Sequence, residues 1–181
     1  MKHHGPSLLS LSAMIAMLTG VVLVVHGPAS QETLPKGRLN DGREQLKPLN
    51  SMIGDWRGVG QVKRGSRIGA WTEKASCVWD FSDKQSAVML ISEGGQQFDH
   101  LRLQWDVAKA KVVLEQKTDD AIRVYVGDMP KKWPGKLSLT SATDADNVTY
   151  RCTIQQLKDI RATILFEKQS SPTGAFRRVV E

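Results

Sequence analysis

An acidic side chain lies among tryptophans in the stretch from Trp71 to Phe81, where a carboxylate could act on a bound molecule. A two-residue period places Trp71, Glu73 and Trp79 on one face. A carboxylate flanked by aromatic rings loses hydration, which raises its pKa and suits it to act as a general acid or as a ligand clamp. Because such a residue more often lies at the mouth of a cavity, we expect the clamp rather than catalysis.

The remaining groups that could do chemistry are few. The chain has four histidines: His3, His4, His26 and His100. Only His100 lies beyond the N-terminal segment, and it alternates with Arg102 on a polar face, which predicts a solvated histidine rather than an axial ligand. A single histidine excludes a histidine-based zinc site and weakens any Ser–His or Cys–His nucleophile. Asp144 and Asp146 have calcium-like spacing but lack the glycine and glutamate of an EF-hand loop, so we expect a turn there, no metal site and no catalytic residue.

The two cysteines, Cys77 and Cys152, both fall on the apolar faces of predicted strands. An even number of cysteines in an oxidising compartment favours a disulfide. However, a disulfide needs Cα atoms within about 7 Å of each other, and the order along the chain does not make these strands neighbours. A disulfide and two buried free thiols, packed as small hydrophobic side chains, therefore remain alternatives.

The N-terminus has the layout of a secretory signal over residues 1–29. Lys2 precedes an uncharged run from Leu8 to Val25, and small residues then lead to a cleavage point after Ala29. The alternative is an uncleaved anchor, because the run is close to the lower length limit for crossing a bilayer. No cysteine follows the run to carry a lipid. We expect an extracytoplasmic protein, periplasmic or secreted, with no stable membrane insertion after cleavage.

The rest of the chain divides into a flexible leader, residues 30–45, and one folded domain, residues 46–181. The domain shows strand after strand with tight connections and almost no helical period. Alternating or apolar segments occupy residues 54–60, 70–82, 98–106, 111–118, 121–127, 136–141, 147–156, 160–168 and 174–180. About nine or ten short strands predict an all-β fold, an antiparallel up-and-down β-barrel, in preference to a β-sandwich or an open sheet. Its interior would be lined by Trp71, Trp79, Leu101, Leu103, Trp105, Val112, Leu114, Ile122 and Val124.

The first of these strands carries the pattern G-x-W-x-G-x-G, formed by Gly54, Trp56, Gly58 and Gly60. This pattern resembles the calycin group, which includes lipocalins, fatty-acid-binding proteins and nitrobindin-like proteins. The longer form is nearest to nitrobindin-like and related bacterial lipocalin-like domains. The resemblance implies that Trp56 packs across the closed end of the barrel, under an arginine of the last strands.

Arg178, or its neighbour Arg177, is the candidate for that partner of Trp56. In the same family the glycines would let the first strand bend sharply enough to close the sheet. Nitrobindin-like proteins hold heme through a histidine near the C-terminus, and this sequence has none there. We therefore expect no cofactor.

The charge balance is basic, with 25 Lys and Arg against 19 Asp and Glu. The densest basic cluster surrounds Trp133 and contains Lys131, Lys132 and Lys136. Such a cluster can bind nucleic acid, but two prolines and a glycine here indicate a rigid solvated loop. We expect no nucleic-acid partner and place Trp133 as a lid at the barrel mouth.

These observations favour a binding protein that holds a small apolar or amphipathic molecule in a barrel cavity. The alternatives are a ligand-free structural or interaction domain, since a small barrel can be filled by its own side chains, and an enzyme, which is the least favoured. The predicted ligand contacts are Trp71, Glu73, Trp79, Leu103, Trp105 and Trp133.

Overall fold

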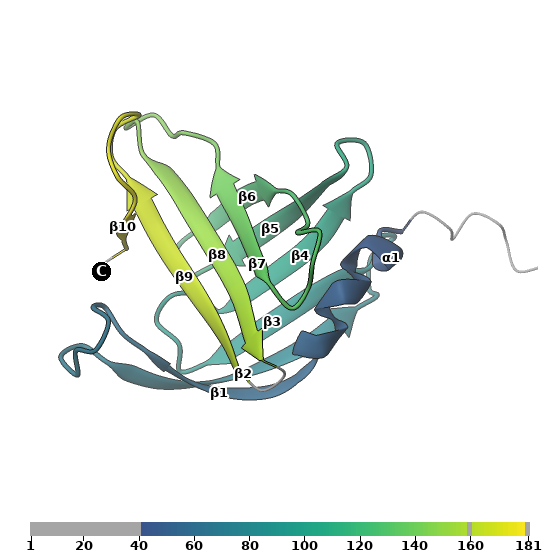
Figure 1. Ribbon diagram of the computed structural model, residues 1–181, viewed down its shortest axis with the longest axis horizontal. Coiled ribbons are helices and arrows are strands. Elements are labelled where there is room, and N and C mark those ends of the chain that lie inside the picture. Colours follow the sequence, from purple (N-terminus) through teal and green to yellow (C-terminus); the bar gives the residue numbers. More distant parts are fainter. Residues whose placement is uncertain (1–40, 159–160, 180–181) are drawn as a thin grey trace, which may run out of the picture. The chain divides into compact units, whose positions relative to one another are not determined.

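The computed structural model describes residues 41–158 and 161–179. A single antiparallel sheet of ten strands dominates this part of the chain, and each strand pairs with the next one in sequence (Figure 1). The strands are β1 Gly54–Gly60, β2 Trp71–Asp80, β3 Ala87–Glu93, β4 His100–Asp106, β5 Lys111–Lys117, β6 Ile122–Gly127, β7 Lys136–Ser141, β8 Thr149–Lys158, β9 Arg161–Gln169 and β10 Arg177–Arg178. The predicted fold class, an all-β up-and-down antiparallel sheet, is confirmed.

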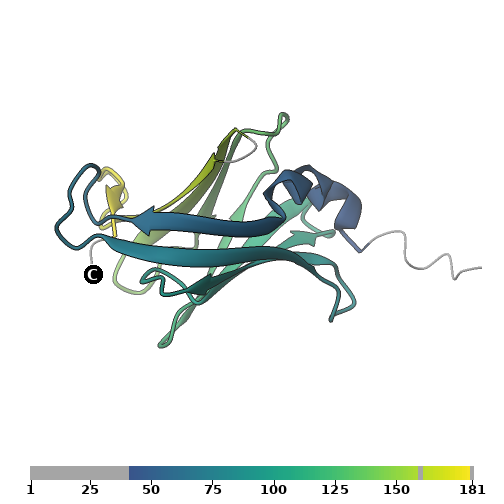
Figure 2. The ribbon, with the colours of Figure 1, turned by 90° about the horizontal axis from the view of Figure 1, so that it is seen from below.

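The sheet curls into a half-barrel and leaves β1 and β10 as its two edge strands. Figure 2 shows β1 and β2 running across the front of the curled sheet. Strand β10 pairs with β9 only at Lys168 and Glu167. Among the described residues, the stretch of β9 from Arg161 to Leu165 therefore has no strand on the side away from β8. Within the described residues β10 pairs with β9 and not with β1, and the sheet keeps an opening between β1 and β9.

Two short helices close one end of the half-barrel. Helix α1, Arg43–Leu46, and the 3₁₀-helix η2, Lys47–Met52, precede β1 and bury three apolar side chains in the core: Leu46, Leu49 and Met52. Hydrogen bonds tie the segment to the sheet, since Ser86 Oγ donates to Asp41 Oδ2 at 2.7 Å. Helix α1 begins inside the predicted leader of residues 30–45. The predicted signal of residues 1–29 lies outside the described residues.

Side chains from the inward face of the sheet form the core. The largest fully buried ones, besides the helical leucines, are Tyr125, Leu101, Leu114, Leu137, Leu139, Ile154, Val88 and Val112. Leu101, Leu103, Val112 and Leu114 are buried, as the sequence predicts. This packing fills the side of the half-barrel that is formed by the central strands.

The prediction for β6 was wrong, because Ile122 and Val124 point outward and are 68% and 45% exposed. Strand β6 pairs with β5 in the register that places Tyr125 opposite Leu114, and directly opposed residues share a face. The Tyr125 hydroxyl also donates to the buried side chain of Gln116. The pairing therefore turns the face of β6 that carries Tyr125 toward the interior. The opposite face, which carries Ile122 and Val124, is more apolar but points outward.

Both cysteines are buried free thiols, which corrects the disulfide alternative. Cys77 lies in β2 between Gly54 and Leu90 of the neighbouring strands, and Cys152 lies in β8. Burial raises the pKa of the Cys77 thiol to about 11 and raises that of Cys152 as well. Neither thiol is therefore a nucleophile at neutral pH.

Candidate functional site

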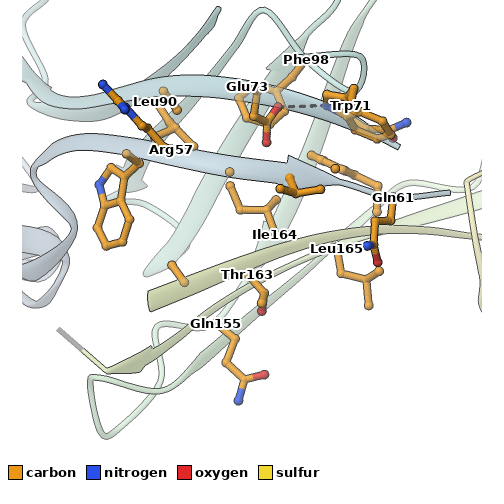
Figure 3. Close-up of a pocket in the computed structure, with 18 of the residues that line it drawn as sticks. Arg57, Gln61, Trp71, Glu73, Leu90, Phe98, Gln155, Thr163, Ile164 and Leu165 are labelled. Carbon is orange, nitrogen blue, oxygen red and sulfur yellow. Dashed lines mark hydrogen bonds between the residues drawn. The ribbon is translucent and has the colours of Figure 1, made fainter. Parts of the chain in front are cut away.

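A pocket of about 540 Å³ lies between the edge of β1 and the first half of β9 (Figure 3). Strands β2, β3, β8 and β10, the 3₁₀-helix η2, the β1–β2 connection and the segment before β4 complete its wall. The apolar part of the lining includes Trp56, Trp71, Leu90, Phe98, Ile164 and Phe166. Because the sheet does not close, this part of the interior is hollow, whereas the region under the central strands is packed.

The glycines of β1 leave the space that two side chains of β2 occupy. Gly60 lies opposite Trp71 and Gly58 lies opposite Glu73. A Cβ atom on Gly60 would lie 1.9 Å from Trp71 Cε2, and one on Gly58 would lie 3.3 Å from Glu73 Oε1. The alternating glycines therefore let the indole and the carboxylate lie across β1, where both line the pocket.

Glu73 is the acidic side chain of this pocket, and its hydrogen bonds are long. Trp71 Nε1 donates to Glu73 Oε2 at 3.3 Å, and Ser92 Oγ donates to the same oxygen at 3.4 Å. No Lys or Arg of the described residues forms an ion pair with Glu73. Gly95 leaves space beside the Glu73 carboxylate, since a Cβ atom at position 95 would lie 2.6 Å from Glu73 Oε2. The carboxylate thus retains capacity to accept a hydrogen bond from a molecule in the pocket.

Trp56 forms the part of the pocket wall nearest the helical end. Its Nε1 donates to the Met52 carbonyl of η2 at 2.7 Å, and its ring packs half-buried against the core. Trp56 therefore lies beside the helical end, but its ring is half-buried and not buried as expected. Arg178 lines the same pocket but lies opposite Glu167 in the β9–β10 pair. Cation–π contacts found in the described part of the chain involve other arginines, so the predicted arginine–tryptophan stacking is not present there.

Four predicted ligand contacts lie elsewhere. Leu103 is buried in the core. Trp79 stacks on Phe81 with ring centroids 5.8 Å apart, and its Nε1 donates to Asn50 of η2. Trp105 packs beside Gly42, at the start of α1, where a Cβ would lie 2.6 Å from Trp105 Cβ.

Trp133 is likewise at the helical end and not at the mouth. Its Nε1 donates to Ser51 Oγ of η2 at 2.9 Å, and its ring packs against the core. The alternation along each strand predicted that the tryptophans share the inward face of the sheet. It did not predict at which end of the half-barrel each of them lies. The order of a meander could have separated them, because β2 starts at one end with Trp71 and finishes at the other with Trp79.

Sequence reasoning missed the contribution of β9 to the pocket. Ile164 and Phe166 alternate on its inward face, and Phe98 enters from the segment before β4. The two-residue period of β9 was visible in the sequence. Its position across the opening from β1 was not, because the two strands are far apart in the chain and do not pair.

The described residues contain no group of three or more His, Cys, Asp or Glu side chains placed to hold a metal ion. His100 lies on β4 opposite Ile91 and Lys117, on the outward face, as predicted. In the same part of the chain, no helix has the length and apolar character needed to span a membrane.

The chain matches no protein-family model, and no match to it was found among curated proteins or solved structures. The curled antiparallel sheet is compatible with a barrel fold. A closer assignment rests on the G-x-W-x-G-x-G pattern alone.

Proposed function

We propose that this chain is an extracytoplasmic binding protein of calycin-like type that holds a small apolar or amphipathic molecule between β1 and β9. The observation that supports this most directly is the pocket of about 540 Å³, whose walls combine aromatic and aliphatic side chains with polar ones, among them Glu73, Gln155 and Arg178. Its volume falls in the range of small-molecule sites, which combine apolar walls with a few polar groups.

The pocket residues divide into two roles in this proposal. The apolar body of the ligand packs on Trp56, Phe98 and Ile164, which lie on different strands or connections around the hollow. A polar group of the ligand donates a hydrogen bond to Glu73, whose carboxylate is held in place by Trp71 Nε1. The proposal includes no catalytic step, no metal and no heme.

A ligand-free structural or interaction domain is the second candidate. It is favoured by the packed interior under the central strands, where Leu101, Leu114, Leu137 and Leu139 are fully buried. In that case the hollow beside β9 would be filled by water or by a partner rather than by a small molecule.

Binding of N-phenyl-1-naphthylamine, a small apolar fluorophore, tests the proposal. We expect saturable binding that primary alcohols of increasing chain length displace. Ile164→Glu should weaken binding at least about tenfold, because it places a charge in an apolar wall. Ile122→Glu is the matched control, since that side chain is exposed on the outer face and should leave affinity unchanged.

Two outcomes would contradict the proposal. One is the absence of saturable binding by any probe, which favours the ligand-free domain. The other is an equal loss of affinity in both variants, which places the bound fluorophore outside the pocket. Native mass spectrometry of the purified chain adds an independent readout, because a retained ligand appears as added mass.

A further inference from the structure

The hairpin that joins β1 to β2 carries basic residues without an acidic one, whereas the connection around Trp133 also contains Asp128. Between Trp56 and Trp71 the chain contains four basic residues and no acidic one: Arg57, Lys63, Arg64 and Arg67. We call residues 57–70 the basic hairpin. All four basic side chains are exposed, and none forms an ion pair with another described residue. In Figures 1 and 2 the tip of this hairpin projects beyond the neighbouring strands.

An apolar side chain stands among these charges. Ile68 is 88% exposed, and Val59 at the base of the hairpin is 65% exposed. The tip has a defined turn structure, because Ser66 N donates to the Lys63 carbonyl at 3.0 Å and Ala70 N donates to the Arg67 carbonyl at 3.3 Å. The turn therefore presents Ile68 to the outside.

Two other turns at the same end of the sheet have the opposite charge, and the β9–β10 connection, residues 170–176, has no charged residue. Asp119 and Asp120 occupy the β5–β6 connection, and Asp144 and Asp146 occupy the β7–β8 connection. Strands of a meander alternate in direction, so these connections lie at the end that also carries the basic hairpin. The positive surface is thus local to the hairpin and is not a consequence of net charge.

We propose that the basic hairpin docks on the surface of an anionic phospholipid bilayer. Its Lys and Arg side chains contact lipid phosphates, and Ile68 inserts at the boundary between the headgroups and the acyl chains, a combination typical of interfacial contacts. The contact is peripheral and needs no spanning segment. It also has a consequence for the pocket, because Gln61 and Arg64 of the same hairpin line it. Docking would bring the pocket to the lipid surface.

A lipid surface suits these side chains better than nucleic acid. Proteins that bind single strands stack bases on aromatic rings, and the tip of the basic hairpin, residues 61–70, contains no aromatic residue. Trp71, at the end of the hairpin, is half-buried and donates to Glu73. An exposed isoleucine gains from contact with acyl chains but not from contact with a phosphodiester backbone.

Vesicle co-sedimentation of the purified chain tests this inference. We compare vesicles of phosphatidylcholine with vesicles that contain phosphatidylcholine and phosphatidylglycerol in equal parts. We expect at least about tenfold stronger partitioning onto the mixed vesicles at low salt, and we expect the preference to fall as salt rises. Lys63→Glu/Arg67→Glu should abolish the preference, and Ile68→Ser should weaken partitioning several-fold while keeping its salt dependence.

A matched control is available at the other end of the sheet. Lys131 and Lys132 are exposed in the β6–β7 connection, and Lys131→Glu/Lys132→Glu changes the net charge by the same amount. This variant should keep the preference for anionic vesicles. Equal loss in both double variants, or equal binding of the unaltered chain to both kinds of vesicle, would overturn the inference, as would retention on heparin or acidic proteins without any vesicle binding.

The failure of this inference can be separated from failure of the proposed function. Lys63, Arg67 and Ile68 do not line the pocket. Their variants should therefore bind N-phenyl-1-naphthylamine as the unaltered chain does, which also shows that they are folded. A chain that binds the fluorophore but not anionic vesicles retains the pocket proposal and refutes the docking proposal.

Discussion

Gly60→Ala is the sharpest test of how the first strand builds the pocket. A Cβ at this position would lie 1.9 Å from Trp71 Cε2, 2.0 Å from Trp71 Cζ2 and 2.5 Å from Trp71 Nε1. All three separations are far below van der Waals contact, so the indole must move. Its displacement also breaks the 3.3 Å hydrogen bond from Nε1 to Glu73.

The expected cost follows from two opposing effects. Overpacking of this kind costs about 1–3 kcal/mol. Replacing a strand glycine by alanine returns about 0.5–1 kcal/mol, because the unfolded chain loses conformational freedom. We therefore expect Gly60→Ala to lower the free energy of unfolding by about 1 kcal/mol, within a range of about 0–2.5 kcal/mol.

Gly58→Ala is the matched control on the same face of the same strand. Its Cβ would lie 3.3 Å from Glu73 Oε1, the end of a flexible side chain that can shift by a few tenths of an ångström. The gain from the unfolded state and the small crowding cost nearly cancel. We expect a change within about 0.5 kcal/mol of zero.

Urea unfolding followed by far-ultraviolet circular dichroism measures both variants, and a double-mutant cycle with Trp71→Ala identifies the cause. In the Trp71→Ala background the space beside Gly60 is empty, so Gly60→Ala should cost nothing there. Two results would refute the reasoning: a Gly60→Ala variant as stable as Gly58→Ala, or a cost that persists without the indole.

Three further predictions concern the stability and packing of the fold. Trp56→Phe should lower the free energy of unfolding in urea by about 1 kcal/mol, since it removes the indole hydrogen bond to η2. An unchanged urea midpoint would show that this hydrogen bond does not stabilise the fold. Thiol titration without reductant should find Cys77 and Cys152 unreactive in the native chain and two thiols per chain after denaturation, whereas no thiols after denaturation would indicate a disulfide. Hydrogen bonds from Ser82 hold the pKa of Asp80 at about 2, below its ordinary value of 3.8. Asp80 therefore stabilises the fold above pH 3.8, and the stability gap between the unaltered chain and Asp80→Asn should shrink as pH falls from about 3.8 to about 2; a gap that does not depend on pH would contradict this.

The sequence by itself determined the strands and most of their inward faces. Side chains alternate from one face of a strand to the other, so Trp71, Glu73 and Cys77 could be assigned together from local spacing. The same reasoning failed in β6, where the outward row is more apolar than the row that contains Tyr125. Register with the neighbouring strand decided that case, and register is not a local property.

The tertiary structure alone decided which inward residues form a site. Alternation specifies a face, but the position of α1 and η2 specifies which end is closed, and this separates Trp71 from Trp79 and Trp133. The pocket exists because the two edges of the sheet, β1 and β10, do not pair with each other. Strand β10 is two residues long and pairs with β9 but not with β1, so β1 and β9 are not joined through it and face each other across the hollow. Pairing between the first and the last strands depends on their length and on the curl of the whole sheet, neither of which is encoded in the spacing within one strand.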